Sequence, residues 1–208
     1  MRVLILGATG GTGMEIVRQT IVRGHSVTAF VRSPEKLGSY KDLITVKQGS
    51  PLDSSALGAV AVGHDAVLSA FGPRVPIALS DQHLLRDFAA ALSQGLRQAG
   101  VKRVILESAA FLFKDALMPP AYLLGKLFFP TVVADAMDME TIIRERELDW
   151  TLLRPPKLTD AKHTGQYRVR EGHLPRFGFS ISRANVADCF LRLLEDTSTG
   201  RKIFGVSS

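Results

Sequence analysis

The chain has 208 residues, of which 46% are hydrophobic and 22% charged, a composition typical of a globular domain with one sizeable core. Its single cysteine excludes a disulfide framework, and Met1 leads directly into an apolar run, so we expect a cytoplasmic protein without signal peptide or membrane span. The net charge of +6 comes from scattered basic residues without interleaved aromatics, and the five histidines show no metal-ligand spacing. We therefore expect neither nucleic acid nor metal.

The first stretch of the chain, residues 2–13, combines a short apolar run with three regularly spaced glycines. Gly7, Gly10 and Gly13 form a G-x-x-G-x-x-G pattern, a variant of the dinucleotide fingerprint at a strand-to-helix turn. In that fingerprint the first glycine allows a tight turn, the second lets backbone N–H groups approach a pyrophosphate, and the third lets the helix pack closely on the strand. Simple turn glycines are the alternative.

An apolar helical face after the glycines favours nucleotide binding over a simple turn. Its residues are Ile16, Val17, Ile21 and Val22, and a second strand follows at Ser26–Val31. The N-terminus of this helix would face the phosphates with the positive end of its dipole. The residues expected to bind the phosphates are Gly7, Ala8, Thr9, Gly10, Gly11, Thr12 and Gly13.

The second strand ends in Arg32, with Lys36 close behind. At this point of NAD-selective sites an acidic residue accepts hydrogen bonds from the ribose 2′-OH, whereas an arginine accommodates a 2′-phosphate. Arg32 and Lys36 therefore predict NADPH as the preferred cofactor over NADH. The alternative is an arginine solvated in a surface loop.

A third strand is expected at Leu43–Lys47, before a helix over Ser54–Val60 that Asp53 caps. The loop between them lies at the carboxyl end of a strand, where α/β sheets bind ligands. The loop residues expected to border the adenine are Ser50, Pro51 and Leu52.

A fourth strand begins near Asp65 and ends in small residues that permit close passage of a cofactor. The cofactor contacts expected there are Ala70, Phe71 and Gly72. Arg74 is expected to meet a phosphate or a substrate carboxylate, with a solvated arginine as the equal alternative. An amphipathic helix then runs from about Asp81 to Ala99 and stops at Gly100.

The fifth strand, Arg103–Glu107, runs directly into Ser108. A hydroxyl at this strand end would sit beside the nicotinamide end of a cofactor laid across the sheet. Ser108 is therefore the best candidate for a catalytic residue and for a contact with substrate or nicotinamide. A serine of ordinary turn chemistry is the alternative.

Tyr122 and Lys126 form a Y-x-x-x-K pair, the arrangement in which lysine lowers the pKa of a catalytic tyrosine in short-chain dehydrogenases. The helix that leads into the sixth strand should instead be Val132–Glu147, with Val132 and Ala136 at the Tyr and Lys places. Neither of those residues transfers protons. We expect residues 114–131 to form a lid or insertion, or a subunit contact.

After a sixth strand at Trp150–Arg154, backbone groups of Pro155 and Pro156 are expected to hold the nicotinamide amide, and Lys157 could point into the substrate cavity. The remaining elements expected are a short hairpin or loop elaboration over 165–169 and 178–181, a helix over Arg183–Leu194 capped by Ser182, and a last strand over Lys202–Gly205.

This alternation of strands and helices predicts a single α/β domain over residues 1–208: a doubly wound, mostly parallel Rossmann-type sheet with helices on both faces and a small C-terminal elaboration. The chain also resembles the atypical short-chain dehydrogenase/reductase superfamily, namely the NmrA-like NAD(P)-binding proteins of the flavin reductase (biliverdin-IXβ reductase) type. The resemblance is carried by the segments Gly7–Gly13, Val31–Ser33, 65–70, 108–112, Leu148–Pro155 and Ile181–Asp188.

The resemblance implies an NADPH-dependent oxidoreductase that passes hydride to a flavin, quinone or tetrapyrrole. We expect a monomer or a dimer. Such planar acceptors imply an apolar pocket that Phe71, Phe111 and Phe113 could line, with a place in the core as the alternative for these residues. Some NmrA-like proteins instead read the NADP/NADPH state and pass it to a protein partner without turnover, so a redox sensor is the alternative. An epimerase or dehydratase fits less well, because those enzymes usually need the Tyr-Lys pair.

Three positions depart from the flavin reductase pattern. Ala109 stands where that enzyme has a second hydroxyl, Ser50 stands where the family often has an aspartate, and Lys157 replaces a histidine. These differences put a specific serine role and the usual adenine contact in doubt, and they leave room for a more acidic acceptor.

Overall fold

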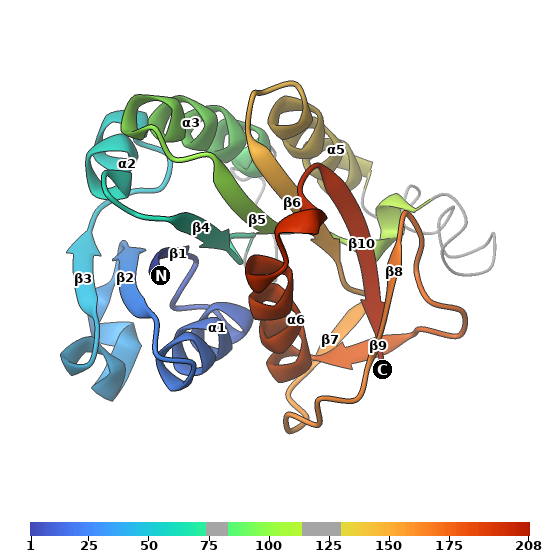
Figure 1. The fold of residues 1–208 in the computed structure, drawn as a ribbon. Helices are drawn as coiled ribbons and strands as arrows, with labels where there is room; N and C mark the ends of the chain where they lie inside the picture. Colours follow the sequence, from blue (N-terminus) through green and yellow to red (C-terminus); the bar gives the residue numbers. More distant parts are fainter. Residues whose placement is uncertain (74–82, 114–129) are drawn as a thin grey trace.

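The computed structural model describes residues 1–73, 83–113 and 130–208 (Figure 1). The elements in chain order are β1 (Arg2–Leu6), α1 (Gly11–Val22), β2 (Ser26–Val31), η1 (Pro34–Asp42), β3 (Thr45–Gln48), α2 (Ser54–Ala61), β4 (Ala66–Ser69), α3 (Leu84–Ala99), β5 (Arg103–Glu107), η3 (Ala110–Leu112), α5 (Pro130–Arg144), β6 (Asp149–Arg154), β7 (Lys157–Thr159), β8 (Arg168–Glu171), β9 (Ser180–Ser182), α6 (Arg183–Glu195), η4 (Thr197–Thr199) and β10 (Lys202–Ser207).

The central sheet has the strand order β3-β2-β1-β4-β5-β6-β10-β8, and every pairing in it is parallel except that of β8 with β10. From β1 the chain first moves outward to β2 and β3, and then returns to start again on the other side with β4. This reversal makes the fold doubly wound, as the sequence predicts. It also places a topological switch point between the carboxyl ends of β1 and β4.

Helices cover both faces of the sheet, with α1 and α6 on one side and α2, α3 and α5 on the other (Figure 1). Strand β1 explains this layering, because its side chains are apolar in both directions. Val3 and Ile5 pack toward α1 and α6, while Leu4 and Leu6 pack toward α2 and α3, and all four are fully buried.

Helix ends follow the sequence signals closely. The carboxylate of Asp53 accepts hydrogen bonds from the N–H groups of Ser55 and Ala56 at the start of α2, and Ser182 caps α6 in the same way. Helix α3 ends at Gly100, whose φ of 71° is left-handed. The predicted start of that helix at Asp81 lies outside the described residues.

Two predicted apolar positions are wrong in detail. The third strand begins at Thr45 rather than Leu43, because Leu43 closes the preceding helical stretch η1 and is 66% exposed. Val22, which the periodicity put on the buried face of α1, is the last residue of that helix and is 76% exposed.

The two C-terminal segments expected to form a short hairpin or a loop elaboration do not pair with each other, so the hairpin alternative is wrong. Strand β8 pairs antiparallel with β10 at the edge of the main sheet, and β9 pairs in parallel with β7 in a separate two-stranded sheet. Each segment finds its partner among distant strands, which local turn signals do not indicate.

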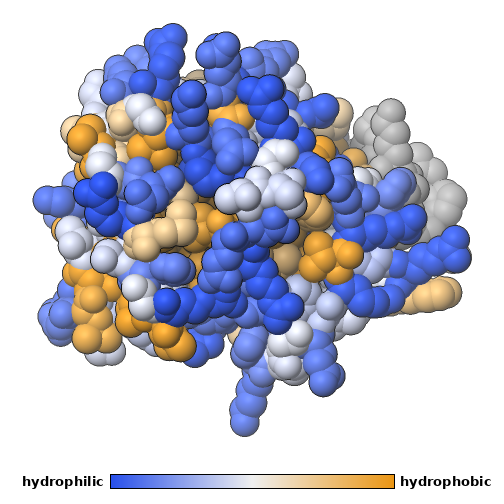
Figure 2. Space-filling model, viewed as in Figure 1, coloured by the Kyte–Doolittle hydropathy of each residue, from blue (hydrophilic) through white to orange (hydrophobic). Residues whose placement is uncertain are grey.

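The face drawn in Figure 2 is largely hydrophilic with small apolar patches. Within the described ranges, no helix has the length and apolar character needed to cross a membrane.

Candidate functional site

A cavity of about 390 Å³ opens at the carboxyl ends of the parallel strands, beside the switch point between β1 and β4. This is where doubly wound sheets bind their ligands. Many residues with a predicted cofactor contact line it: Gly7, Thr9, Gly10, Gly11, Thr12, Arg32, Pro51, Ala70, Phe71, Gly72 and Ser108.

The glycine turn at one end of the cavity has the close approaches that its sequence pattern requires. Gly7 has a φ of 73°, and a Cβ there would lie 2.5 Å from the carbonyl oxygen of Ala70. A Cβ on Gly13 would collide with the carbonyl of Gly7, so helix α1 can start this close to β1 only with glycine. Gly10 donates its N–H to that same carbonyl at 2.9 Å, which closes the turn.

Arg32 immediately follows β2, and its exposed side chain lines the cavity together with Ser33. Within the described part of the chain, no carboxylate lies close enough to form an ion pair with this guanidinium. Its charge is therefore available to an anionic group on a ligand. Lys36 is exposed but is not among the residues that line the cavity.

Other predicted contacts lie beside the cavity rather than on its wall. Ser50 Oγ accepts the N–H of Leu52, and the carbonyl of Pro155 accepts the N–H of Ala110, so both groups hold loops in place. The predicted contacts that do not line the cavity are Ala8, Gly13, Lys36, Ser50, Leu52, Pro155 and Pro156. Arg74, Tyr122 and Lys126, with most of the expected lid, lie outside the described residues.

Ser108 lines the cavity and takes part in a buried polar cluster. Its hydroxyl donates a 2.5 Å hydrogen bond to Oε1 of Glu140 on α5. Glu140 is paired in turn with Arg154 at the end of β6, whose Nε lies 2.9 Å from the same oxygen. Because a hydroxyl carries only one proton, Ser108 presents only oxygen lone pairs to the cavity in this arrangement.

The Glu140–Arg154 pair was not anticipated from the sequence. Both residues are buried, and the ring of Phe113 stacks against the Arg154 guanidinium at 4.6 Å, which makes Phe113 part of the core rather than of the cavity wall. The sequence held one signal for a buried role of Glu140. This residue lies four positions after Ala136, and therefore on the same side of α5 as that apolar residue.

The residues of α5 that line the cavity are all apolar. Val132, Ala136 and Met139 line the cavity, as does Phe111 from η3. Val132 and Ala136 stand at the two places expected for a dehydrogenase Tyr-Lys pair, and neither side chain transfers protons. Lys157 is exposed and does not line the cavity, whereas its neighbour Leu158 does.

Glu107, the last residue of β5, lines the cavity, although its sequence pattern indicates only the end of a strand. Its carboxylate accepts a 3.5 Å hydrogen bond from the hydroxyl of Thr12 on α1. Burial raises the pKa of Glu107 to about 7, against the opposing effects of the Thr12 hydrogen bond and the charge of Arg183. The sequence signal that could have indicated a role for Glu107 in the site is its position, as an acidic residue at the carboxyl end of a strand.

Arg183, the first residue of α6, lies across the glycine turn. A Cβ on Gly11 would come within 2.6 Å of Arg183 Cδ, so a side chain there would displace the arginine. The guanidinium forms a 2.5 Å ion pair with Asp160, which holds it at the cavity wall. The sequence predicts the helix start but not this position, because it depends on contact between α6 and α1.

Comparison with known proteins supports a nucleotide-binding site. The profile of a family described as NAD(P)H-binding matches residues 7–197. An uncharacterised chloroplast protein of Arabidopsis thaliana is 30% identical over 97% of this chain and 75% of its own length, and the uncharacterised protein YwnB of Bacillus subtilis is 29% identical over 94% and 92%. A wide-type short-chain dehydrogenase/reductase from Veillonella parvula, solved in complex with NADP, has the same fold, with a TM-score of 0.80, 20% identity and coverage of 100% and 94%.

Proposed function

We propose that this chain, which belongs to the NAD(P)H-binding family, is an NADPH-dependent oxidoreductase that passes hydride to a planar conjugated acceptor such as a flavin, quinone or tetrapyrrole. One observation carries the proposal: a single cavity joins a glycine turn, an arginine at the end of β2 and an apolar wall on α5. The first two features suit the phosphates of the cofactor, and the third suits an aromatic acceptor.

The residues around the cavity fit NADPH in a definite order. The N–H groups at the start of α1 suit the pyrophosphate, because the helix dipole and the close backbone favour anions. Arg32 and Ser33 suit a 2′-phosphate at the β2 end, and this is the basis for proposing NADPH over NADH. The opposite end, near Ser108, would then take the nicotinamide.

Ser108 is proposed to position the reacting ring rather than to donate a proton. Its hydroxyl proton is held by Glu140, so the oxygen can accept a hydrogen bond from the N–H₂ of a carboxamide or from an N–H of the acceptor. When bound, NADPH supplies the hydride, and the protein supplies orientation and water exclusion. Phe71, Phe111 and Met139 provide the apolar surroundings for the acceptor.

The test is the steady-state oxidation of NADPH and NADH by the purified protein with FMN, riboflavin, a simple quinone and biliverdin as acceptors. Turnover with one of these acceptors and a preference for NADPH is the expected result. Turnover with NADH alone would contradict the cofactor assignment, and turnover with none of the acceptors, despite NADPH binding, would contradict the reductase.

A redox sensor that binds NADP(H) without turnover is the second candidate. It is favoured by the cavity face of α5, where Val132 and Ala136 offer no group that transfers a proton. The sensor should bind NADP⁺ and NADPH with different affinities but should not oxidise bound NADPH at a useful rate with any of the acceptors. Equilibrium titration with both forms, combined with the turnover assay above, separates the two candidates.

A further inference from the structure

We propose that Glu107 binds the nicotinamide cofactor as a neutral carboxylic acid, so that cofactor binding takes up a proton at this residue. The inference rests on the cofactor binding proposed above but not on turnover. It applies equally to a reductase and to a sensor, and it concerns a residue with no role in the function proposed so far.

The position of Glu107 follows from the alternation of side chains along β5. Ile105 packs in the core under α1 and α6, so Glu107, two residues later, points to the same side of the sheet. There its carboxyl group meets the hydroxyl of Thr12, the second residue of α1, at 3.5 Å. Glu107 therefore stands directly beside the helix start at which the cofactor phosphates are proposed to bind.

The charged groups around Glu107 offer little compensation for a carboxylate. Thr12 on α1 is neutral, and the neighbouring cation, Arg183 on α6, is already paired with Asp160 at 2.5 Å. Leu158 of β7 adds an apolar neighbour on the cavity wall, and Ser108, next in the chain, is turned toward Glu140. In the described ranges no cation forms an ion pair with Glu107.

An anionic cofactor would make this situation worse for the charged form. A carboxylate in a cavity repels a nearby pyrophosphate, whereas a protonated carboxyl can donate a hydrogen bond to a phosphate or carboxamide oxygen. Binding should thus favour the neutral acid. The pKa of Glu107 is already raised to about 7 in the free protein. Above that pH most of the free protein carries the carboxylate, so formation of the complex has to take up a proton from solution.

The sign of the linkage is fixed by this direction. A pKa that rises on binding gives full affinity below the pKa of the free protein and progressively weaker affinity above it. If the bound form keeps its proton throughout, the dissociation constant should rise about 30-fold between about pH 6 and about pH 8.5, from the free pKa of about 7.

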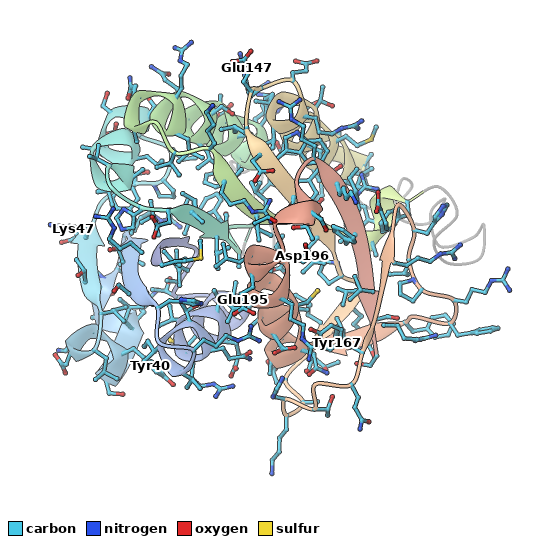
Figure 3. All side chains as sticks on the ribbon, viewed as in Figure 1. Tyr40, Lys47, Glu147, Tyr167, Glu195 and Asp196 are labelled. Atoms are coloured by element: carbon cyan, nitrogen blue, oxygen red, sulfur yellow. The ribbon has the colours of Figure 1, made fainter. Side chains whose placement is uncertain are left out.

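The experiment measures NADPH and NADH affinity by fluorescence titration across this range for the wild type, for Glu107→Gln and for Glu147→Gln. NADH is included because the 2′-phosphate of NADPH itself titrates near a pH of about 6. Glu147 is the matched control, since it is exposed and precedes β6, at the amino end of the strand and away from the cavity (Figure 3). Calorimetric titration of the wild type in buffers of different ionisation enthalpy counts the protons directly.

We expect the wild type and Glu147→Gln to lose affinity for both coenzymes with rising pH, and Glu107→Gln, which stays neutral and keeps a donor, to lose less than about threefold. Calorimetry at about pH 8 should show uptake of close to one proton. Affinity of the wild type for NADH that is independent of pH, or an unchanged slope in Glu107→Gln, would overturn the inference. Absence of binding at every pH would instead remove the cofactor assignment and this inference with it. The proton count needs no variant, so it decides the question even if Glu107→Gln does not fold.

Discussion

The hydroxyl of Ser108 lies 2.5 Å from a carboxylate oxygen of Glu140, and that oxygen is simultaneously 2.9 Å from Nε of Arg154. One buried carboxylate on α5 therefore connects Ser108, which follows β5 and lines the cavity, to Arg154 at the end of the neighbouring strand β6. The orientation of Ser108 depends on this pair rather than on its own loop.

Removing Glu140 should destabilise the protein strongly. Glu140→Ala leaves Arg154 buried without its partner, which typically costs about 3–5 kcal/mol of unfolding free energy. Ser108→Ala is the matched control, because it removes one hydrogen bond but keeps the ion pair, and it should cost about 1 kcal/mol. Urea unfolding followed by circular dichroism measures both, and equal losses would show that the ion pair does not hold this part of the fold.

Reversing the charge of Arg32 should change coenzyme preference rather than abolish binding. Arg32→Glu removes the proposed 2′-phosphate partner, so NADPH affinity should fall about 10- to 100-fold, the value of a charge-assisted hydrogen bond or two, while NADH affinity changes little. Lys36→Glu, outside the cavity wall, should have a smaller effect. The measurement is equilibrium titration with both coenzymes, and equal losses for the two would contradict the 2′-phosphate assignment.

The glycine turn should not tolerate even a methyl group at its third glycine. Gly13→Ala drives a Cβ into the carbonyl of Gly7 and forces α1 away from β1, which should cost about 1–3 kcal/mol as an overpacked contact. Gly72→Ala is a suitable control, because a Cβ at Gly72 meets no atom of the described residues within 4 Å. Thermal unfolding of both variants checks the difference. A Gly13→Ala variant as stable as Gly72→Ala would mean that the turn has room to relax.

A second carboxylate ties the other side of the molecule together and should govern its acid stability. Asp188 on α6 lies 2.6 Å from Arg23, accepts a 2.6 Å hydrogen bond from Tyr167 and pairs with Arg192 at 2.8 Å (Tyr167 is labelled in Figure 3). Burial would raise the pKa of Asp188, but the Tyr167 hydrogen bond and the two arginines outweigh it and hold the pKa below its ordinary value.

A carboxylate with a lowered pKa in the folded state stabilises the protein above its ordinary pKa, and this contribution disappears as the pH falls through the lowered value. Asp188→Asn should therefore lower the unfolding free energy by about 2 kcal/mol at neutral pH, and by progressively less in acid below a pH of about 4. Urea unfolding at a series of pH values measures this. A constant difference between Asp188→Asn and wild type throughout the acid range would contradict it.

The sequence predicts the elements well where one local signal decides them. β5 runs over Arg103–Glu107 as expected, and Ser182 and Gly100 mark helix ends as their residue types indicate. The pairing of β8 with β10 could not be predicted in the same way, because the partners are brought together only after the chain has formed a complete helix between them.

The candidate site shows the same division. The glycine turn and Arg32 were identified because a short, continuous motif specifies them. Glu107 and Arg183 were missed, since their place in the cavity depends on α1 meeting β5 and α6, contacts between segments separated by most of the chain. Side-chain chemistry that arises from such contacts leaves no regular spacing to read.

Strand β8 has a further consequence for the behaviour of the protein in solution. It lies at the end of the sheet, where an open row of backbone groups could recruit another chain and begin aggregation. Its residues are Arg168, Val169, Arg170 and Glu171, and all four are exposed. Charged side chains therefore flank Val169, the one apolar residue of this strand. The antiparallel strand that extends the sheet thus also hinders the addition of further chains at this edge. An Arg170→Val variant should therefore aggregate more readily than the wild type.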